Sequence, residues 1–319
     1  MRRVELFFVF LVEYCFIDGL SGLNWKQYDG FNPEEHENYK LLPPKNSCGT
    51  NGLGTQTESE KIVGGYETKL GEIPWIVQYG EYINGIFNFY CGASLISERY
   101  VLLAAHCINA SLNPERFTVR LGEWNITGDP DSQGDLHAPP VQDIKIAEII
   151  PHKDYHSLKN DIALIRLETT ATLGFFVQPV CLPYGAAMSK DFTNQDALAA
   201  GWGSTKSRPG PFPTILLAVK QTVADAQKCK DAYSNVDVEV NYNDGKICFG
   251  GDEGKNVCFG DSGGPLLWKG SFEPDITVRT YLLGVAAHVG DLTCVKKGFP
   301  GVFTRTNFFM KWILDHMRA

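Results

Sequence analysis

The hexapeptide Gly260-Asp261-Ser262-Gly263-Gly264-Pro265 places a serine hydroxyl among small residues and directly after an acidic residue. A serine hydroxyl is a poor nucleophile unless a histidine takes its proton and a carboxylate holds that histidine. Both partners occur upstream, as His106 in Leu-Ala-Ala-His-Cys and as Asp161 in Asn-Asp-Ile-Ala-Leu. The pattern therefore predicts Ser262 as nucleophile, His106 as general base and then acid, and Asp161 as the group that fixes the histidine tautomer.

A fourth motif, Ile62-Val63-Gly64-Gly65, precedes these three, and the candidate residues follow the chain order His, Asp, Ser. In these four motifs the chain resembles the trypsin-like (chymotrypsin-fold) secreted serine proteases, over residues 62–319. The resemblance implies an all-β fold of two six-stranded antiparallel β-barrels with the active site between them. His106 and Asp161 would come from the first barrel and Ser262 from the second. It also implies a monomer that hydrolyses peptide bonds.

The local sequence supports the all-β class independently. Short apolar, β-rich runs separated by turns are typical of an antiparallel sandwich or barrel, and they lie at 75–79, 89–96, 117–121 and 147–150. A short amphipathic helix is expected over 309–317, and we expect its Trp312 and Ile313 to pack on the second barrel.

The amino-terminal part divides into two segments before the protease domain at 62–319. Residues 1–22 begin with a basic pair and continue into a short apolar run, which is typical of a secretory signal peptide. Residues 23–61 are polar and lack a sustained period, so we expect an extended, mostly irregular pro-segment. Many arthropod relatives carry a disulfide-rich clip domain here. This stretch has Cys48 as its single cysteine, so no clip domain is expected in it.

Charge narrows the set of partners. The formal net charge of −8 gives no reason to expect nucleic acid or an anionic membrane as a partner, because either would favour a basic surface. The resemblance implies instead a protein or peptide substrate, an upstream activating protease and a protein inhibitor.

The number of cysteines is consistent with a secreted protein. Loss of the signal peptide would leave eight of the nine cysteines, an even number that fits an oxidising compartment. Sequence alone does not choose among their pairings, but the resemblance implies four bridges, Cys48–Cys181, Cys91–Cys107, Cys229–Cys248 and Cys258–Cys294. Asn109-Ala-Ser and Asn125-Ile-Thr are acceptor sequences for N-linked glycans in a secreted glycoprotein.

The junction of Lys61 and Ile62 predicts activation by proteolysis. In the family, cleavage here frees an α-ammonium that inserts and pairs with the acid before the nucleophile, which is Asp261 in this chain. That ion pair sets the loop whose Gly260 and Ser262 N–H groups would form the oxyanion hole. The resemblance therefore implies a zymogen whose pro-segment stays attached after cleavage through the bridge from Cys48.

The predicted specificity pocket departs from trypsin. Members that cut after arginine or lysine have an aspartate where this chain has Asn256, and a buried cationic substrate group would go unpaired there. Val289 replaces a glycine and narrows the pocket, whereas Gly301 keeps the other wall open. We therefore expect a neutral pocket for small or medium apolar side chains.

Two further departures leave a second function open. Ala287 lacks the hydroxyl that the family serine uses to donate to the catalytic carboxylate. His288 replaces the tryptophan against which substrate packs, and it is either a surface histidine, which is the favoured interpretation, or a group that makes binding sensitive to pH. The alternative is a catalytically weak or inactive homologue that acts as a binding partner in an extracellular proteolytic cascade.

No cofactor is expected, although one loop allows a calcium ion as an alternative. Residues 123–135 contain oxygen ligands in the region of the family's calcium loop, and Glu123 and Asn125 match that loop. The later glutamates do not fall at the family's spacing, so an acidic surface loop is the favoured interpretation.

Overall fold

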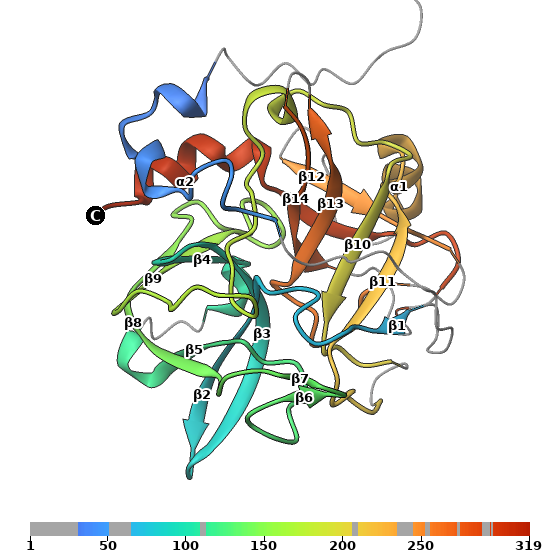
Figure 1. Cartoon of the computed structure of the whole chain (residues 1–319). Coiled ribbons are helices and arrows are strands. Elements are labelled where there is room, and N and C mark those ends of the chain that lie inside the picture. The colour runs from blue at the N-terminus through green and yellow to red at the C-terminus, as the bar shows by residue number, and fades with distance from the viewer. Residues whose placement is uncertain are drawn as a thin grey trace, which may run out of the picture.

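A computed structural model describes most of the chain. The described residues are 31–50, 65–108, 113–205, 210–234, 245–252, 256–272, 275–288, 294 and 296–319. Most of them lie in two strand-rich halves packed side by side, with two short α-helices at the periphery (Figure 1).

The first half is a closed antiparallel barrel with the strand order β2-β3-β4-β9-β8-β5. Its strands are β2 (Ile76–Ile83), β3 (Ile86–Ser97), β4 (Tyr100–Leu103), β5 (Phe117–Leu121), β8 (Gln142–Pro151) and β9 (Ala163–Leu167). Along β5, buried residues alternate with half-buried ones, as the two-residue repeat of a strand requires. The four predicted strand runs all fall within or overlap these strands, which confirms them.

The second half is a curled seven-stranded sheet with the order β1-β11-β10-β13-β14-β15-β12. Its strands are β1 (Tyr66–Glu67), β10 (Asp196–Gly201), β11 (Leu217–Thr222), β12 (Lys246–Phe249), β13 (Pro265–Phe272), β14 (Asp275–His288) and β15 (Gly301–Arg305). An isolated bridge between Val223 and Phe249 joins the β11 and β12 sides. The predicted fold class is confirmed, with two differences in the second half: its strands form a curled sheet whose two sides are linked, among the described residues, by this bridge, and the sheet includes β1 as an added strand.

The remaining elements are short. A small hairpin consists of β6 (Ser132–Gln133) and β7 (Leu136–His137). The 3₁₀ helices are η1 (Pro33–Glu35), η2 (Glu37–Leu41), η3 (Ala105–Cys107), η4 (Pro114–Arg116), η5 (Gly185–Met188) and η7 (Asn307–Phe309). No helix among the described residues is long and apolar enough to cross a membrane.

The two α-helices include one that the sequence did not predict. Helix α1 (Ala226–Tyr233) begins at Asp225, whose carboxylate accepts hydrogen bonds from two backbone N–H groups of the first turn. Helix α2 (Met310–His316) confirms the predicted carboxyl-terminal helix. Its Trp312 ring lies 5.3 Å from the ring of His152, the residue that directly follows β8. Trp312 therefore packs on the first barrel, and the prediction that it packs on the second was wrong.

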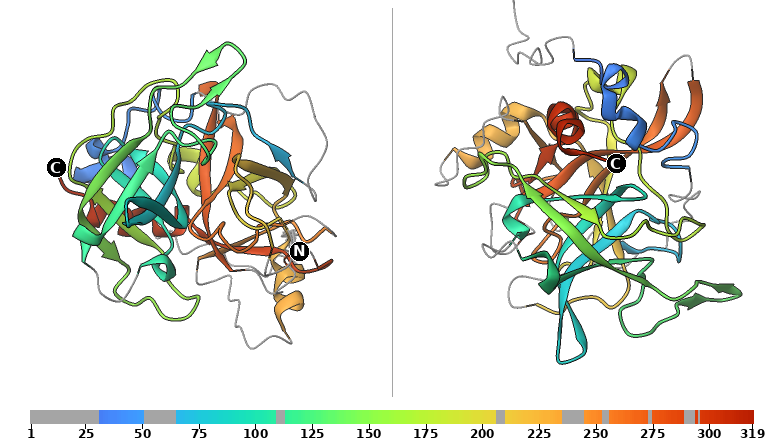
Figure 2. Two further views of the ribbon diagram at one scale, coloured as in Figure 1. Left: turned by 90° about the horizontal axis from the view of Figure 1, so that it is seen from below. Right: turned by 90° about the vertical axis from the view of Figure 1, so that its left-hand side faces the viewer.

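Residues 31–50, which we call the strap, are docked on the two strand-rich halves and on α2. The Asn38 amide donates to the carbonyls of Leu314 and Met317 at 3.0 and 2.8 Å, so it satisfies two acceptors at the end of α2. Figure 2 shows the strap beside this helix. At the other end of the strap, Gly49 donates to Pro179 and accepts from Thr280. The described part of the predicted pro-segment thus consists of short 3₁₀ helices and irregular chain that is held against other parts of the molecule, whereas residues 23–30 and 51–61 lie outside the described residues.

All four predicted disulfides are present. They join Cys48 to Cys181, Cys91 to Cys107, Cys229 to Cys248 and Cys258 to Cys294. Each long loop that they close limits the freedom of the unfolded chain, which stabilises the fold.

Candidate active site

His106 and Asp161 meet at one end of the first barrel. His106 lies in η3 directly after β4, and Asp161 precedes β9, the strand that pairs with β4. His106 Nδ1 lies 2.7 Å from Asp161 Oδ2, and the His106 backbone N–H donates to Asp161 Oδ1 at 2.8 Å. Asp161 is fully buried, whereas 27% of the His106 side chain is exposed. The carboxylate therefore fixes the orientation of the ring through Nδ1. The other ring nitrogen, Nε2, is left to accept and release a proton on the exposed side of the histidine.

Ser262 lies on a loop that both halves of the molecule hold. The Gly92 N–H of β3 donates to the Ser262 carbonyl at 2.8 Å, and the Gly263 N–H donates to Ala286 of β14 at 2.8 Å. A Cβ atom added at Gly263 would lie 3.2 Å from Cys107 Sγ. Because Cys107 follows His106, the loop lies against the neighbourhood of the histidine.

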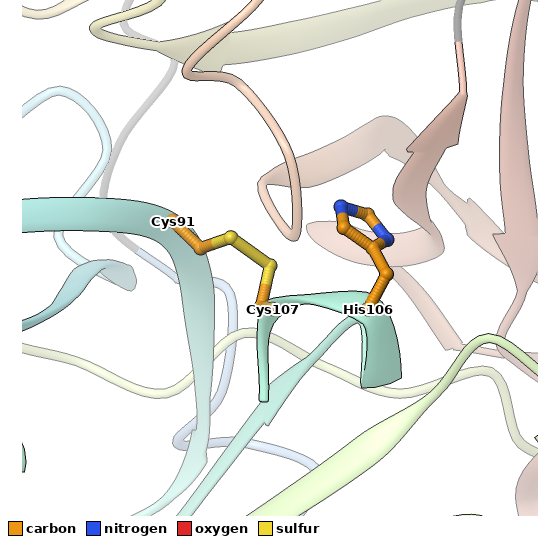
Figure 3. A group of neighbouring side chains, drawn as sticks. All are labelled: Cys91, His106 and Cys107. Carbon is orange, nitrogen blue, oxygen red and sulfur yellow. A yellow bond between two sulfur atoms is a disulfide. The ribbon is translucent and has the colours of Figure 1, made fainter. Parts of the chain in front are cut away.

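The disulfide between Cys91 and Cys107 stands beside the His106 ring (Figure 3). It ties η3 to β3, and β3 in turn bonds the serine loop. Among the described contacts there is no hydrogen bond between the Ser262 hydroxyl and the His106 ring. Such bonds are often long in enzymes without substrate and tighten when substrate binds.

Two backbone N–H groups around the serine have no acceptor among the described residues. The amides of Asp261, Gly263 and Gly264 all donate to backbone carbonyls. Within the described part of the chain, those of Gly260 and Ser262 donate to none. Gly260 has φ +99°, a conformation that a side chain would strain. The loop thus offers the two donors that the sequence assigned to an oxyanion hole.

Asp261 is held by backbone amides, and the described residues provide no cation beside it. Its Oδ1 accepts from the Gly203 N–H and its Oδ2 from the Cys258 N–H, both at 2.8 Å. Burial raises its pKa to about 6, and the two amides oppose that rise. No charged partner of Asp261 is found among the described residues. Lys61 and Ile62, the predicted cleavage junction, lie outside the described residues.

Two of the three predicted pocket residues lie together. The Asn256 amide donates to the Phe299 carbonyl at 2.9 Å, and its Oδ1 accepts from the Val257 N–H at 2.9 Å. A Cβ atom at Gly301 would lie 2.9 Å from that same Oδ1. The floor is therefore neutral and held by backbone. The third residue, Val289, lies outside the described residues.

The substituted residues of β14 adjoin the histidine and the carboxylate. Both described hydrogen bonds of Asp161 come from His106, so Ala287 supplies no third donor. Burial lowers the pKa of His288, and the nearby His106 and Lys246 lower it further. His288 therefore presents a neutral imidazole near the site at neutral pH.

Sequence analysis missed two supporting residues. Gly203 approaches the Asp261 carboxylate so closely that a Cβ atom would lie 2.3 Å from it. In the sequence, the two glycines on either side of Trp202, Gly201 and Gly203, were the available indication of this close approach. Tyr233 donates from its hydroxyl to the Pro300 carbonyl at 2.7 Å, and its ring lies 6.1 Å from that of His288. It braces the pocket wall from helix α1, which the sequence did not predict.

In the acidic loop at 123–135, the side-chain oxygens of Glu123 and Asn125 accept hydrogen bonds from groups of the protein itself. Glu123 accepts from the Trp124 N–H at 3.1 Å and lies 3.4 Å from Arg120, and Asn125 Oδ1 accepts from the Thr127 hydroxyl at 2.8 Å. Burial and then the Asp131 carboxylate raise the pKa of Glu123 to about 7. Each of these two matching residues thus has a donor within the protein for a side-chain oxygen, and calcium stays an untested alternative.

Other predicted sites are placed as follows. The one described cluster of three histidine, cysteine or acidic side chains within reach of a single ion consists of Cys91, His106 and Cys107, and its two cysteines are bonded to each other. Asn125 of the second glycan sequence is half-buried, and Asn109 lies outside the described residues. Glycosylation therefore stays a prediction.

Comparison with known proteins agrees with this geometry. Residues 62–313 match the family described as Trypsin. The chain is 36% identical to "CLIP domain-containing serine protease HP8" of Bombyx mori, over 87% of this chain and 73% of that protein. It is 35% identical to "Phenoloxidase-activating factor 3" of Holotrichia diomphalia, over 87% of this chain and 77% of that protein. It is 34% identical to "Spaetzle-processing enzyme" of Drosophila melanogaster, over 86% and 69% of the two chains. The chain therefore belongs to the trypsin family of serine proteases.

Proposed function

We propose that this chain is a secreted serine endopeptidase, made as a zymogen and activated by cleavage after Lys61. The observation that carries the proposal is the paired bonding of His106 to buried Asp161, at 2.7 and 2.8 Å. This pair lies beside a serine loop in which two N–H groups have no acceptor in the described part of the chain.

The chemistry follows from these positions. As Ser262 Oγ attacks the substrate carbonyl carbon, His106 Nε2 takes the hydroxyl proton, and the Gly260 and Ser262 N–H groups stabilise the charge on the carbonyl oxygen. The tetrahedral intermediate collapses, the C–N bond breaks, and His106 gives its proton to the leaving amine. Water then attacks the acyl-enzyme with His106 again as base, which frees the acid product and Ser262.

The proposed activation depends on the Asp261 carboxylate, which has no charged partner in the part of the chain that the structure describes. Cleavage after Lys61 creates an α-ammonium at Ile62, which supplies the positive charge that Asp261 lacks among the described residues. Pairing would fix Asp261 and with it the amides on either side. The disulfide between Cys48 and Cys181, together with the docked strap, keeps the amino-terminal piece attached after cleavage.

The names of two relatives support a cascade role. "Phenoloxidase-activating factor 3" and "Spaetzle-processing enzyme" denote proteins that act on other proteins. We infer a protein substrate, an upstream activating protease and a protein inhibitor for this chain, as a monomer outside the cell. The signal peptide at 1–22, the glycans at Asn109 and Asn125 and the four disulfides belong to the same proposal.

The test is hydrolysis of a peptide panel by protein cleaved after Lys61. The peptides differ only in the residue before the scissile bond. The neutral floor at Asn256 predicts hydrolysis after small or medium apolar residues, and little after arginine or lysine. Ser262→Ala protein is the control. Folded, cleaved protein that hydrolyses none of the peptides would contradict the proposal.

One observation favours a second candidate, a weak or inactive homologue that binds partners. Asp161 receives no hydrogen bond from β14 where Ala287 stands. A missing bond to a charged acceptor weakens catalysis by about tenfold to a hundredfold. If Ala287→Ser raises kcat on the peptide panel while KM stays constant, the chain is a catalyst with a weakened site and not a binding homologue.

A further inference from the structure

The peptide plane between Phe259 and Gly260 carries one of the two N–H groups assigned to the oxyanion hole. The Ser204 N–H donates to the Phe259 carbonyl at 2.8 Å. In a planar trans peptide the C=O and N–H groups point in opposite directions, and this peptide is trans. The bond from Ser204 therefore directs the Gly260 N–H away from Ser204. The direction of this oxyanion donor depends on the orientation of that one plane.

Gly260 does little to fix this orientation by itself. Its φ is +99°, and a glycine changes its backbone angles at little cost because it has no Cβ atom. The residue that follows is fixed, since the Asp261 N–H donates to the Cys258 carbonyl at 3.0 Å and the Asp261 carboxylate accepts from Gly203. Rotation of the plane before Gly260 would turn the donor away from the substrate oxygen. The oxyanion hole therefore benefits from any contact that restricts Gly260.

The ring of Phe212 makes such a contact. A Cβ atom added at Gly260 would lie 3.0 Å from Phe212 Cε1 and 3.1 Å from the α-carbon of Gly203. The ring and the Gly203 backbone thus pack against the α-carbon of Gly260. The Thr205 N–H donates to the Pro211 carbonyl at 3.4 Å, which brings the residue before Phe212 beside the chain that follows Gly203. The Phe212 side chain is 60% exposed, so its removal should leave the core intact.

We propose that Phe212 is a positioning residue for the oxyanion hole, whose ring holds Gly260 so that its N–H stays directed at the substrate carbonyl oxygen. Phe212 acts through Gly260 and does not touch the reacting atoms. This inference rests on the proposed endopeptidase function and adds a residue to its machinery. The charge on the oxygen develops only toward the transition state, so loss of the ring should lower kcat and leave KM little changed.

The first test measures kcat and KM of the cleaved protein on a peptide p-nitroanilide, which has no amino-acid residues after the scissile bond. Phe212→Ala should lower kcat about tenfold, less than the roughly hundredfold or more expected for complete loss of a donor. Phe212→Tyr retains the ring and should retain kcat. A loss of kcat that appears only with peptides extended beyond the scissile bond would overturn the proposal, because Phe212 would then be a substrate contact.

Phe175 gives a matched control. Its side chain is 53% exposed, and a Cβ atom at Gly71, which has φ +80°, would lie 2.6 Å from its ring. Phe175 is therefore also an exposed phenylalanine on a glycine with positive φ, but that glycine precedes β2. Phe175→Ala should leave kcat and KM unchanged. Equal losses of kcat in Phe175→Ala and Phe212→Ala would contradict the assignment, because they would report a general loosening of the fold.

A second readout does not require activity. The dipeptide Phe-Gly occurs twice in the chain, at 249–250 and 259–260. Protein with ¹³C in the phenylalanine carbonyl and ¹⁵N in glycine therefore gives correlated amide signals from Gly250 and Gly260. The Gly250 N–H donates to the Thr222 carbonyl at 2.9 Å and serves as the internal reference.

This spectrum is recorded on cleaved Ser262→Ala protein with and without Phe212→Ala. Loss of the ring should broaden or split the Gly260 signal, because the peptide plane before it then samples more than one orientation, and should leave the Gly250 signal unchanged. An unchanged Gly260 signal would overturn the proposal.

The two readouts separate this proposal from the endopeptidase function. If the cleaved protein with Phe212 intact hydrolyses no substrate, the endopeptidase proposal fails, and the Gly260 signal still decides whether the ring holds the glycine. If the cleaved protein is active and Phe212→Ala changes neither kcat nor the Gly260 signal, the positioning role fails and the endopeptidase proposal stands.

Discussion

Cleavage after Lys61 should change how the stability of the protein depends on pH, and Asp261 sets the size of the effect. In the intact chain its pKa is raised from 3.8 to about 6. A carboxyl whose pKa is raised by folding contributes stability that is full below the unfolded pKa and is lost as pH rises through the folded pKa. Two pKa units correspond to about 3 kcal/mol as an upper limit, and about 1.4 kcal/mol of this loss falls between pH 5 and 7.

The new α-ammonium at Ile62, with a reference pKa of about 8, should cancel this loss in the cleaved protein. The assay is urea unfolding of Ser262→Ala protein, intact and cleaved, at pH 5 and pH 7. The disulfide between Cys48 and Cys181 keeps the cleaved pieces in one molecule, so both forms unfold without dissociation. The free energy of unfolding of the cleaved form, relative to the intact form, should rise by about 1.4 kcal/mol over this range.

Asp261→Asn provides the control, because it removes the titrating group while keeping the shape of the side chain. In that variant the difference between intact and cleaved protein should not vary with pH. Parallel pH profiles for the intact and cleaved forms of the protein with Asp261 would refute the reasoning, since no cation would then have reached the carboxylate.

Three further substitutions test separate parts of the account. Asp161→Asn leaves the Nδ1 atom of His106 without its acceptor, and kcat should fall by about a thousandfold or more with KM little changed. Asn256→Asp places a negative charge on the pocket floor. It should raise the ratio of kcat/KM for arginine peptides to kcat/KM for apolar peptides by about tenfold or more. Asn38→Ala frees two carbonyls at the end of α2 and should lower the free energy of unfolding by about 1–3 kcal/mol in urea titrations. Asn113→Ala, at an exposed 3₁₀ cap, is the control and should cost less.

The sequence predicted the parts that depend on local motifs. The serine, histidine and aspartate stand in short stretches whose neighbours are small or apolar, and strand alternation together with the family resemblance was enough to assign the barrels. His106 and Asp161 bond as predicted because their elements, β4 and β9, are adjacent strands. The disulfides followed from the resemblance, not from the spacing of the cysteines.

The parts that failed depend on tertiary contacts. Trp312 was assigned to the wrong barrel because the periodicity of a helix shows which face is apolar but not which surface covers it. The strap appeared irregular because its order comes from contacts distant in sequence, such as that of Asn38 with the carboxyl-terminal helix. Helix α1 is short, and its apolar pattern is weak, so its cap at Asp225 was the available signal.

The most direct test of the central claim is intact-mass detection of a fluorophosphonate adduct before and after cleavage at Lys61, with Ser262→Ala as control. The account predicts one adduct per molecule in the cleaved protein, little or none in the intact chain, and none in the variant. Correctly cleaved and folded protein that never forms the adduct would contradict the account, and the binding homologue would then describe this chain.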